Sequence, residues 1–406
     1  MSAYCENMNV RQPLDLSTTR VDLLDPELYR SNPHDIWTWM RANEPVYRDE
    51  KNKLWGITRH ADVMDVERRS SVFVSGLGYR AVYGPGEANM IAQDDPRHRQ
   101  QRMLVQPQLT RTAVEKRTAE VEALVADLVA DAVGQGEFEV IDLIAAQLPA
   151  RLTTRLLGFP EEMWPQLKSW SERLMRTDMR ERDENIMNEI FNANVEFYVA
   201  MQPILAEVSA CPRDDFMSIW ANAEIDGEKL PLDSIVHEVG LFIAGGAETT
   251  RTAISHGLRA FCDHQDQWEE MAANPALVDS AVEEVLRWVT PLNNFFRTAV
   301  TDDVVGGQAI AAGDRIVMLY PSANHDEAVF ADPFVFDIHR SPNPHLSFGF
   351  GTHLCVGANL ARLVLTTVFR ELSARATNLT VVTEPDIEAN IFARAVRSFS
   401  LSVTPR

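Results

Sequence analysis

The chain has 406 residues, with 59 Asp and Glu against 38 Lys and Arg, so its formal net charge is −21 at pH 7. A composition of 45% hydrophobic and 24% charged residues is that of a globular protein and excludes collagen-like, coiled-coil and disordered classes. The acidic balance disfavours binding to nucleic acid or anionic lipid. Single, scattered cysteines, the absence of a signal-peptide pattern and charges in every long apolar stretch predict a cytoplasmic protein without membrane insertion.

Short β-like pieces at 45–48 and 54–58 and a glycine-punctuated loop at 76–88 come first along the chain. From about residue 96 the helical period dominates. Apolar residues at three-to-four spacing predict helices at 112–133, 161–175, 184–208, 233–262, 275–289 and 358–374. Alternating segments at 304–319 and 379–403 predict strands, and no repeat or long linker divides the chain. The sequence therefore predicts one large unit that is mainly α, with an α+β arrangement.

A cysteine stands in the glycine-rich segment FGFGTHLCVG, residues 348–357, directly before the last predicted helix. Free backbone N–H groups at a helix start lower the pKa of a thiol, and glycines let the backbone fold closely around a flat cofactor. A lone cysteine is more often a small buried core residue. The full pattern FxxGxHxCxG, together with three further motifs upstream, overturns that interpretation for Cys355.

The three upstream motifs are AGGAETT at 244–250, EVLR at 284–287 and DPRHRQQR at 95–102. Paired glycines inside a helix cost stability, so AGGAETT indicates a distortion or the close approach of a ligand. Helical spacing places Gly245, Phe242, Leu241 and Glu238 on the face of Thr249. An isolated ExxR pair is a common surface feature, and residues 98 and 102 point the same way on a helix.

With these motifs in this order, the chain resembles the cytochrome P450 superfamily of haem-thiolate monooxygenases from about residue 22 to the C-terminus. Residues 1–21 would then be an N-terminal extension and residues 22–406 the haem domain. The resemblance implies the P450 fold, a helix-rich triangular prism with small β-sheets, and haem b as cofactor. It makes Cys355 the axial ligand of the haem iron, with Phe348 and Gly357 beside the sulfur. The haem propionates would be held by His98, Arg102, Arg297 and His353.

The resemblance also assigns chemistry and scaffold roles. Thr249 would support bound dioxygen and Glu248 would help to deliver protons, while Glu284, Arg287 and Arg340 would form a structural clamp. Because no part of the chain is left for a fused redox domain, electrons from NAD(P)H would arrive through an external ferredoxin and ferredoxin reductase. A basic patch for that partner would draw on Arg99, Arg111, Lys116, Arg117 and Arg362.

The predicted substrate is apolar, because aliphatic and aromatic side chains dominate the predicted pocket lining. That lining consists of Leu77, Tyr79, Val82, Tyr83, Met90, Ile91, Leu241, Phe242, Ala244, Gly245, Phe295, Phe296 and Phe392. The runs MRANEPV at 40–46 and SANHDEAVF at 322–330 resemble actinobacterial enzymes that oxidise sterol side chains, and terpene hydroxylases share much of the second run.

Three alternatives stay open. The first is a hydroxylase of a monoterpenoid or a small alkyl-aromatic compound. The second is a peroxide-using enzyme, and the third is a non-catalytic haem carrier or gas sensor. The acid and alcohol pair Glu248 and Thr249 disfavours the second and the third, since neither needs a proton relay.

Overall fold

The computed structural model describes residues 20–84 and 86–406, so the predicted extension at 1–21 lies almost entirely outside the described residues. The helices are α1 Pro26–Arg30, α2 His34–Asn43, α3 His60–Arg68, α4 Arg97–Val105, α5 Arg111–Glu115, α6 Thr118–Gln135, α7 Gln147–Leu157, α8 Trp164–Leu174, α9 Glu184–Ala210, α10 Phe216–Asn222, α11 Leu232–Asp263, α12 Gln265–Ala273, α13 Val278–Val289, α14 Tyr320–Ala323 and α15 Ala358–Arg375. The strands are β1 Val46–Asp49, β2 Leu54–Ile57, β3 Phe73–Val74, β4 Glu137–Glu139, β5 Glu224–Ile225, β6 Glu228–Lys229, β7 Asn294–Ala299, β8 Asp303–Val305, β9 Gln308–Ile310, β10 Arg315–Leu319, β11 Ala376–Thr383 and β12 Ser400–Pro405.

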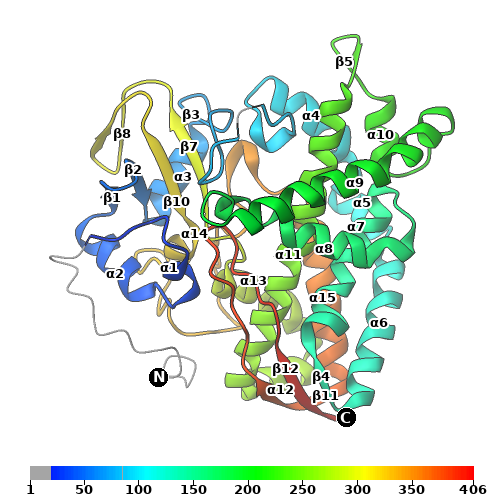
Figure 1. Cartoon of the computed structure of the whole chain (residues 1–406). Helices are drawn as coiled ribbons and strands as arrows, with labels where there is room; N and C mark the ends of the chain where they lie inside the picture. The colour runs from blue at the N-terminus through cyan, green and yellow to red at the C-terminus, as the bar shows by residue number, and fades with distance from the viewer. Residues whose placement is uncertain (1–19, 85) are drawn as a thin grey trace.

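The largest sheet joins segments that are far apart in the sequence. Its strand order is β1-β2-β10-β7-β3, in which β10 runs parallel to β2 and antiparallel to β7. Figure 1 shows this sheet with α1, α2 and α3 on one side of the molecule and the long helices on the other. A smaller sheet, β11-β12-β4, brings the C-terminal strand beside the start of the helical region.

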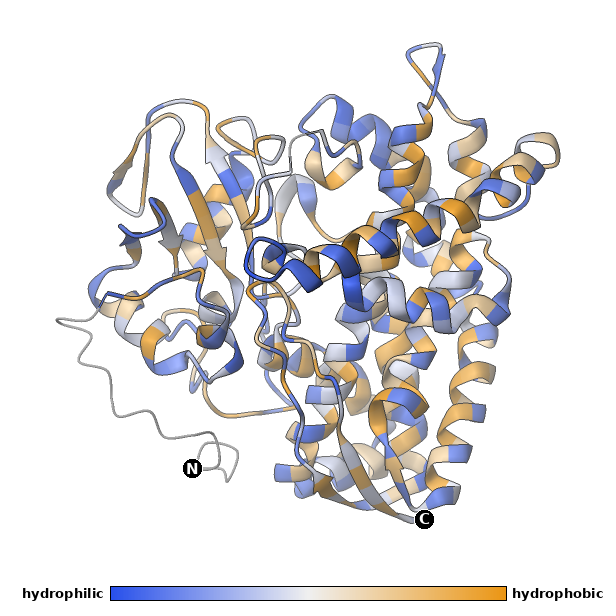
Figure 2. Cartoon of the chain, in the orientation of Figure 1, coloured by the Kyte–Doolittle hydropathy of each residue, from blue (hydrophilic) through white to orange (hydrophobic). Residues whose placement is uncertain are grey.

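The long helix α11 forms the axis of the helical region. It packs against α7, α8 and α13, and α15 lies against both α6 and α13. Val121, Leu124 and Leu128 of α6 are buried in the same core cluster as the α15 residues Leu365 and Val368. In Figure 2, hydrophobic and hydrophilic residues alternate along α6. Apolar burial on this scale holds the helices in place, at about 25 cal/mol per Å² of apolar surface.

The predicted fold class is confirmed, and the differences concern element boundaries. The predicted helix at 112–133 is divided into α5 and α6, with the break at Lys116 and Arg117. The predicted helix at 275–289 begins with a tight 3-10 turn that Asn274 caps, because its side chain accepts a hydrogen bond from the N–H of Ala276. The helices α7, α10 and α12 were not predicted, since each has only 7 to 11 residues and offers few turns of helical spacing.

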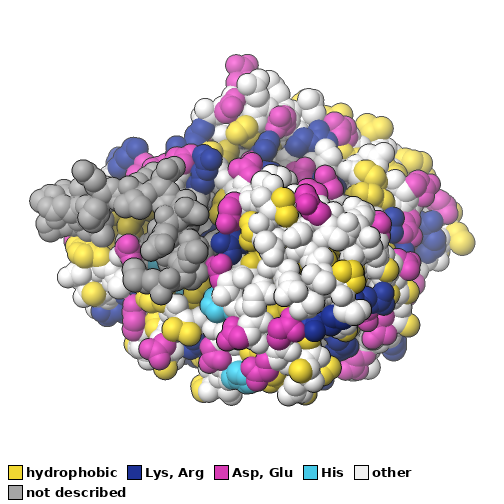
Figure 3. Space-filling model, turned by 90° about the horizontal axis from the view of Figure 1, so that it is seen from below, with side chains coloured by type: hydrophobic (Ala, Val, Ile, Leu, Met, Phe, Trp, Pro, Cys, Tyr) yellow, Lys and Arg dark blue, Asp and Glu magenta, His cyan; other side chains and the backbone are white. Residues whose placement is uncertain are grey.

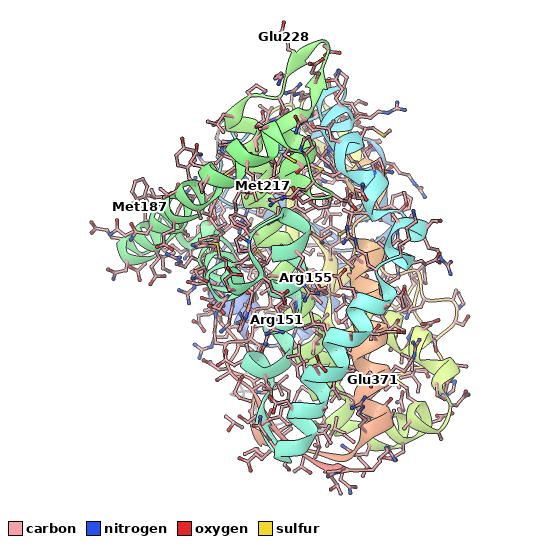
Figure 4. The ribbon with its side chains drawn as sticks, turned by 90° about the vertical axis from the view of Figure 1, so that its right-hand side faces the viewer. Arg151, Arg155, Met187, Met217, Glu228 and Glu371 are labelled. Carbon is pink, nitrogen blue, oxygen red and sulfur yellow. The ribbon has the colours of Figure 1, made fainter. Side chains whose placement is uncertain are left out.

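The surface carries charges of both signs. From below, Figure 3 shows acidic and basic side chains interspersed over the face. In Figure 4, Arg151 and Arg155 of α7 lie beside α6, where Nη1 of Arg155 donates to Glu120 at 2.9 Å. Met187 lies toward the projecting end of α9, whereas Met217 of α10 is fully buried. Among residues 20–84 and 86–406, none of the helices combines the length and the hydrophobicity that a membrane crossing requires.

Candidate active site

The loop before α15 places Cys355 in the wall of a cavity. The backbone N–H of Cys355 donates to the carbonyl oxygen of Phe348 at 2.8 Å, which closes the loop. Gly351 has φ of +69°, and a Cβ atom there would lie 2.7 Å from the backbone oxygen of Glu67 in α3. Only glycine fits this position, because both the backbone conformation and the close approach exclude a side chain. The loop is therefore held tightly against α3.

The electrostatic surroundings of Cys355 differ from the sequence expectation. Burial raises the pKa of its thiol, while a hydrogen bond from Gly357 and the positive charges of Arg102 and Arg362 lower it. Desolvation is the largest effect, so the pKa of the thiol is raised, and the lowering expected from the helix start alone does not prevail. A bound metal ion would reverse this, since a coordinated thiol is deprotonated.

Two predicted propionate partners, His98 and His353, lie side by side with their ring centroids 4.1 Å apart. Nε2 of His353 is 3.2 Å from the hydroxyl of Ser75, and its Nδ1 is buried without a hydrogen-bond partner among the described residues. Burial and the charges of Arg297, His98 and Arg102 lower the pKa of His353 to about 2. The charges of Arg297, His98 and Arg102 all act on His353, so the four predicted basic groups lie near one another. The unpartnered Nδ1 of His353 in this cluster fits a contact with a haem carboxylate.

A carboxylate that the sequence did not indicate also contacts this cluster. Nη2 of Arg297 donates to Oε2 of Glu67 at 3.2 Å, and the hydroxyl of Tyr320 donates to the other carboxylate oxygen. All three side chains are buried. Glu67 and Arg297 are 230 residues apart, so local spacing carried no signal. The only indication in the sequence was that Glu67 lies four positions after Val63, on the apolar face of α3.

The helix α11 places Thr249 and the two glycines of AGGAETT. It is unbroken through Gly245 and Gly246, so the expected distortion is wrong. A Cβ atom on Gly246 would lie 2.7 Å from Oγ1 of Thr153, so this glycine is needed where α7 crosses closely. A Cβ atom on Gly245 would meet nothing within 4 Å. That face of α11 is open, and there the Thr249 hydroxyl donates to the Gly245 carbonyl at 2.9 Å.

Glu248 lies in a buried ion-pair network on another side of α11. Its Oε2 is 3.3 Å from Nη1 of Arg251 and 3.9 Å from Nη1 of Arg397, and its Oε1 has no hydrogen-bond partner among the described residues. Arg251 also binds Glu172 of α8 at 2.5 Å, and Arg397 binds Glu388. The structure therefore joins Glu248 to α8 and to the C-terminal segment, and it gives this carboxylate no contact with the neighbouring threonine hydroxyl.

Three residues of the predicted pocket form one aromatic wall. The ring of Phe295 lies 6.3 Å from that of Tyr79 and 5.2 Å from that of Phe392. Met175, which follows α8 and was not predicted, is buried with Phe392, and Ala244 of α11 packs against the same cluster. The wall thus joins the loop at 76–88, β7, α8, α11 and the C-terminal segment.

The other predicted lining residues are more dispersed. Alternation along β7 turns Phe296 to the opposite face of the sheet, into a core with Trp37 and Tyr47, so its assignment to the pocket is wrong. The Phe242 ring packs edge-on against Phe216 and Trp220 of α10. Met90 is buried, whereas the remaining members are exposed or half-buried: Leu77 and Tyr83 are exposed, and Val82, Ile91 and Leu241 are half-buried.

The predicted clamp residues lie together in the core. Glu284 accepts hydrogen bonds from Arg287 at 2.7 Å and from Arg340 at 3.1 Å. Arg287 also donates to the carbonyl oxygens of Asn324 and Pro333. The side chains of Glu284 and Arg287 have no exposed surface. This cluster joins α13 to the segment at 324–340, which precedes the cysteine loop.

Basic side chains gather on the outer side of the cysteine loop. A cavity of about 670 Å³ is lined by Cys355 together with Arg102, Arg111 and Arg362. Arg111 is 87% exposed, whereas Arg362 is 41% exposed and its Nε lies 2.6 Å from Glu283. Of the other predicted patch residues, Arg99 and Lys116 are exposed and Arg117 is half-buried.

Comparison with known proteins identifies the family. A sequence model described as cytochrome P450 matches residues 259–375. The chain is 36% identical over 393 residues to a steroid C26-monooxygenase of Mycobacterium tuberculosis, covering 95% of this chain and 97% of that protein. It is 31% identical to linalool 8-monooxygenase of Pseudomonas putida, covering 95% of this chain and 100% of that protein.

Solved structures agree with this assignment. A cytochrome P450 of Mycobacterium marinum in complex with pseudoionone aligns with a TM-score of 0.86 and 31% identity, over 95% of this chain and 100% of that one. A Bacillus megaterium P450 in complex with testosterone aligns with a TM-score of 0.85 and 27% identity, over 93% of this chain and 99% of that one. The chain therefore belongs to the cytochrome P450 family and is a haem-thiolate monooxygenase.

Proposed function

We propose that Cys355 ligates the iron of haem b and that His98, Arg102, Arg297 and His353 hold its propionates. One observation carries this proposal: a thiol in a cavity wall that Arg102 also lines, and a cluster of basic groups with an orphaned nitrogen that includes Arg102, match the iron and the propionate edge of such a cofactor. Bound haem supplies the activation of dioxygen with NAD(P)H-derived electrons. The protein provides the ligand, the counter-charges and a site that excludes water.

Thr249 and Glu248 would control protons in this site. The Thr249 hydroxyl donates its hydrogen to the Gly245 carbonyl, so its oxygen is free to accept a hydrogen bond on the open face of α11. Glu248 is buried between Arg251 and Arg397, from which a side-chain rotation would bring the carboxylate toward that face. We assign the positioning of protons at dioxygen to Thr249, with Glu248 as the group that resupplies them.

Replacing Thr249 by alanine is expected to leave substrate binding and NADH oxidation near wild-type levels while diverting electrons to hydrogen peroxide. The reason is that protons are no longer placed at the distal oxygen, so reduced dioxygen escapes. Product and peroxide formed per NADH measure the effect, which we expect to be at least about tenfold in the product-to-peroxide ratio, as for the loss of an acid–base group. The matched control is Thr250→Ala, because Thr250 is buried in the same helix away from the open face. Unchanged coupling in Thr249→Ala would remove the assigned role.

The proposed substrate is a sterol, oxidised on its side chain. The aromatic wall of Tyr79, Phe295 and Phe392 and the side chains of Met175 and Ala244 supply the apolar contacts such a molecule needs. Relatives named as steroid C26-monooxygenases support this choice, as does the testosterone complex of a structural neighbour. The similarity to linalool 8-monooxygenase and to the P450 in complex with pseudoionone supports a terpenoid as the alternative substrate.

Optical titration of the ferric protein is expected to show a larger low-to-high-spin shift, at lower concentration, for cholest-4-en-3-one than for terpineol. An entering apolar ligand displaces the water on ferric iron, and affinity grows with buried apolar area at about 25 cal/mol per Å². A small alkylbenzene serves as a third ligand. A full shift with terpineol or the alkylbenzene at micromolar concentration, with none from the sterol, would replace the sterol by the smaller substrate class.

The electron donor would be a ferredoxin with its reductase, docking where Arg111 and Arg362 line the outer side of the cysteine loop. Arg111 is 87% exposed and pairs with Glu115 at 3.1 Å, whereas Arg362 is 41% exposed and pairs with Glu283. A local basic surface on a chain of net charge −21 is what an acidic donor requires for orientation.

A further inference from the structure

A buried carboxyl group, Glu238, lies on the open face of α11 and is used neither by the proposed chemistry nor by the clamp. Residues seven and eleven positions apart lie within about 20° of one another around a helix of 3.6 residues per turn. Glu238 therefore points in nearly the same direction as Gly245 and Thr249. A Cβ atom on Gly245 would meet nothing within 4 Å, so this side of the helix borders open space at Gly245. The Glu238 side chain itself has no exposed surface.

Only one of the two Glu238 oxygens has a partner. Oε1 accepts a hydrogen bond from the N–H of Met90 at 2.8 Å, whereas Oε2 is buried without a hydrogen-bond partner among the described residues. The loop that carries Met90 is also fixed from α4, because Gln101 donates to the Ala88 carbonyl at 2.6 Å and Nδ1 of His98 is 2.8 Å from the Met90 carbonyl. Holding the loop therefore does not account for Oε2, and an unpaired buried polar atom is costly to keep.

The protonation state of Glu238 decides what it can bind. Burial raises the pKa of this carboxyl to about 8, while the Met90 N–H and the charge of Arg97 oppose the shift. At neutral pH the group is therefore mainly a neutral carboxylic acid. A neutral acid donates one hydrogen bond and accepts others, so it suits a carbonyl or hydroxyl oxygen and needs no cationic ligand.

We propose that Glu238 determines specificity by hydrogen-bonding, through Oε2, the oxygen substituent at the end of the substrate remote from the oxidised carbon. The inference rests on the proposed function, because Thr249 marks the reacting end. Eleven residues of helix separate Thr249 from Glu238 by about 16 Å along the axis. A sterol with an oxygen on its first ring and a hydrocarbon side chain can span that length, whereas a ten-carbon terpenoid is too short to reach both ends.

The test compares two ligands that differ only in the remote oxygen, cholest-4-en-3-one and the 3-deoxy hydrocarbon cholest-4-ene, by spin-shift titration of the haem-loaded protein. The wild type is expected to bind the ketone about tenfold more tightly than the hydrocarbon, the ratio that one well-placed hydrogen bond supplies. Glu238→Met is expected to remove this preference by weakening ketone binding alone. Glu238→Gln is the matched variant, because its amide can still accept from Met90 and donate to the ketone, and it should keep the preference.

Two results would overturn the inference and leave the sterol assignment intact. The first is equal affinity of the wild type for ketone and hydrocarbon, a comparison that needs no variant to fold. The second is equal weakening of both ligands in Glu238→Met, which would show that the side chain only supports the loop. If neither ligand shifted the wild-type spectrum, the proposed sterol substrate would be overturned instead, and the role of Glu238 with it. The Soret spectrum and thermal melting of each variant verify that the cofactor pocket is folded.

Discussion

Replacing Cys355 by histidine is expected to abolish the red-shifted Soret band that the ferrous protein gives with carbon monoxide. That band depends on a strongly donating thiolate trans to the gas, and a neutral imidazole donates much less electron density. Monooxygenase turnover is expected to fall to background at the same time, since the ligand favours O–O cleavage. The measurement is the reduced difference spectrum with carbon monoxide, supported by product analysis.

The control for this experiment lies elsewhere in the same chain. Cys211 is exposed, and its replacement by serine should leave the band unchanged. Cys262 of α11 is half-buried and packs against the helical core, and its replacement by serine should likewise leave the band unchanged. Persistence of the band in Cys355→His would mean that another residue binds the iron and that the assignment of the cysteine loop is mistaken.

The elements that sequence reasoning placed well are those with a strong local signal. The long helices α9, α11 and α15 have apolar residues at helical spacing over many turns, so their extents agree with the predicted ranges to within two residues at each end. The cysteine loop was recognisable for a related reason: Gly351 is fixed by its backbone conformation and by the contact with Glu67, and such constraints leave a readable pattern.

What could not be predicted depends on contacts between distant segments. The ion pair between Arg297 and Glu67 joins β7 to α3, and the local sequence around either residue does not indicate the other as its partner. Phe296 was assigned to the pocket beside Phe295 because both are aromatic, but a strand turns adjacent side chains to opposite faces, and the face is set by strand pairing. Likewise, the lack of a hydrogen-bond partner for Glu238 Oε2 among the described residues can be seen only once the structure brings α11 and the loop at Met90 together.

The distinction between buried and exposed ion pairs leads to the largest expected effect on stability. Replacing Glu284 by alanine removes the only side-chain carboxylate that the structure records within ion-pair distance of Arg287 and Arg340 among the described residues. Arg287 is then left in the core with an uncompensated charge. Breaking a buried pair from one side in this way costs about 3–5 kcal/mol in the free energy of unfolding.

The neighbouring acid Glu283 is the matched control for this prediction. It stands on the same helix and pairs with Arg362 at 2.6 Å and with His345 at 3.0 Å, but its side chain is 30% exposed. Water screens such a pair, so Glu283→Ala is expected to cost about 1 kcal/mol or less. Urea unfolding followed by circular dichroism measures both variants, and the slope with denaturant should stay constant for each. If the two variants lost equal stability, burial of the Glu284 cluster would not be what makes it a clamp. The hydrogen bonds from Arg287 to the carbonyls of Asn324 and Pro333 would then have to hold α13 to the segment at 324–333 by themselves.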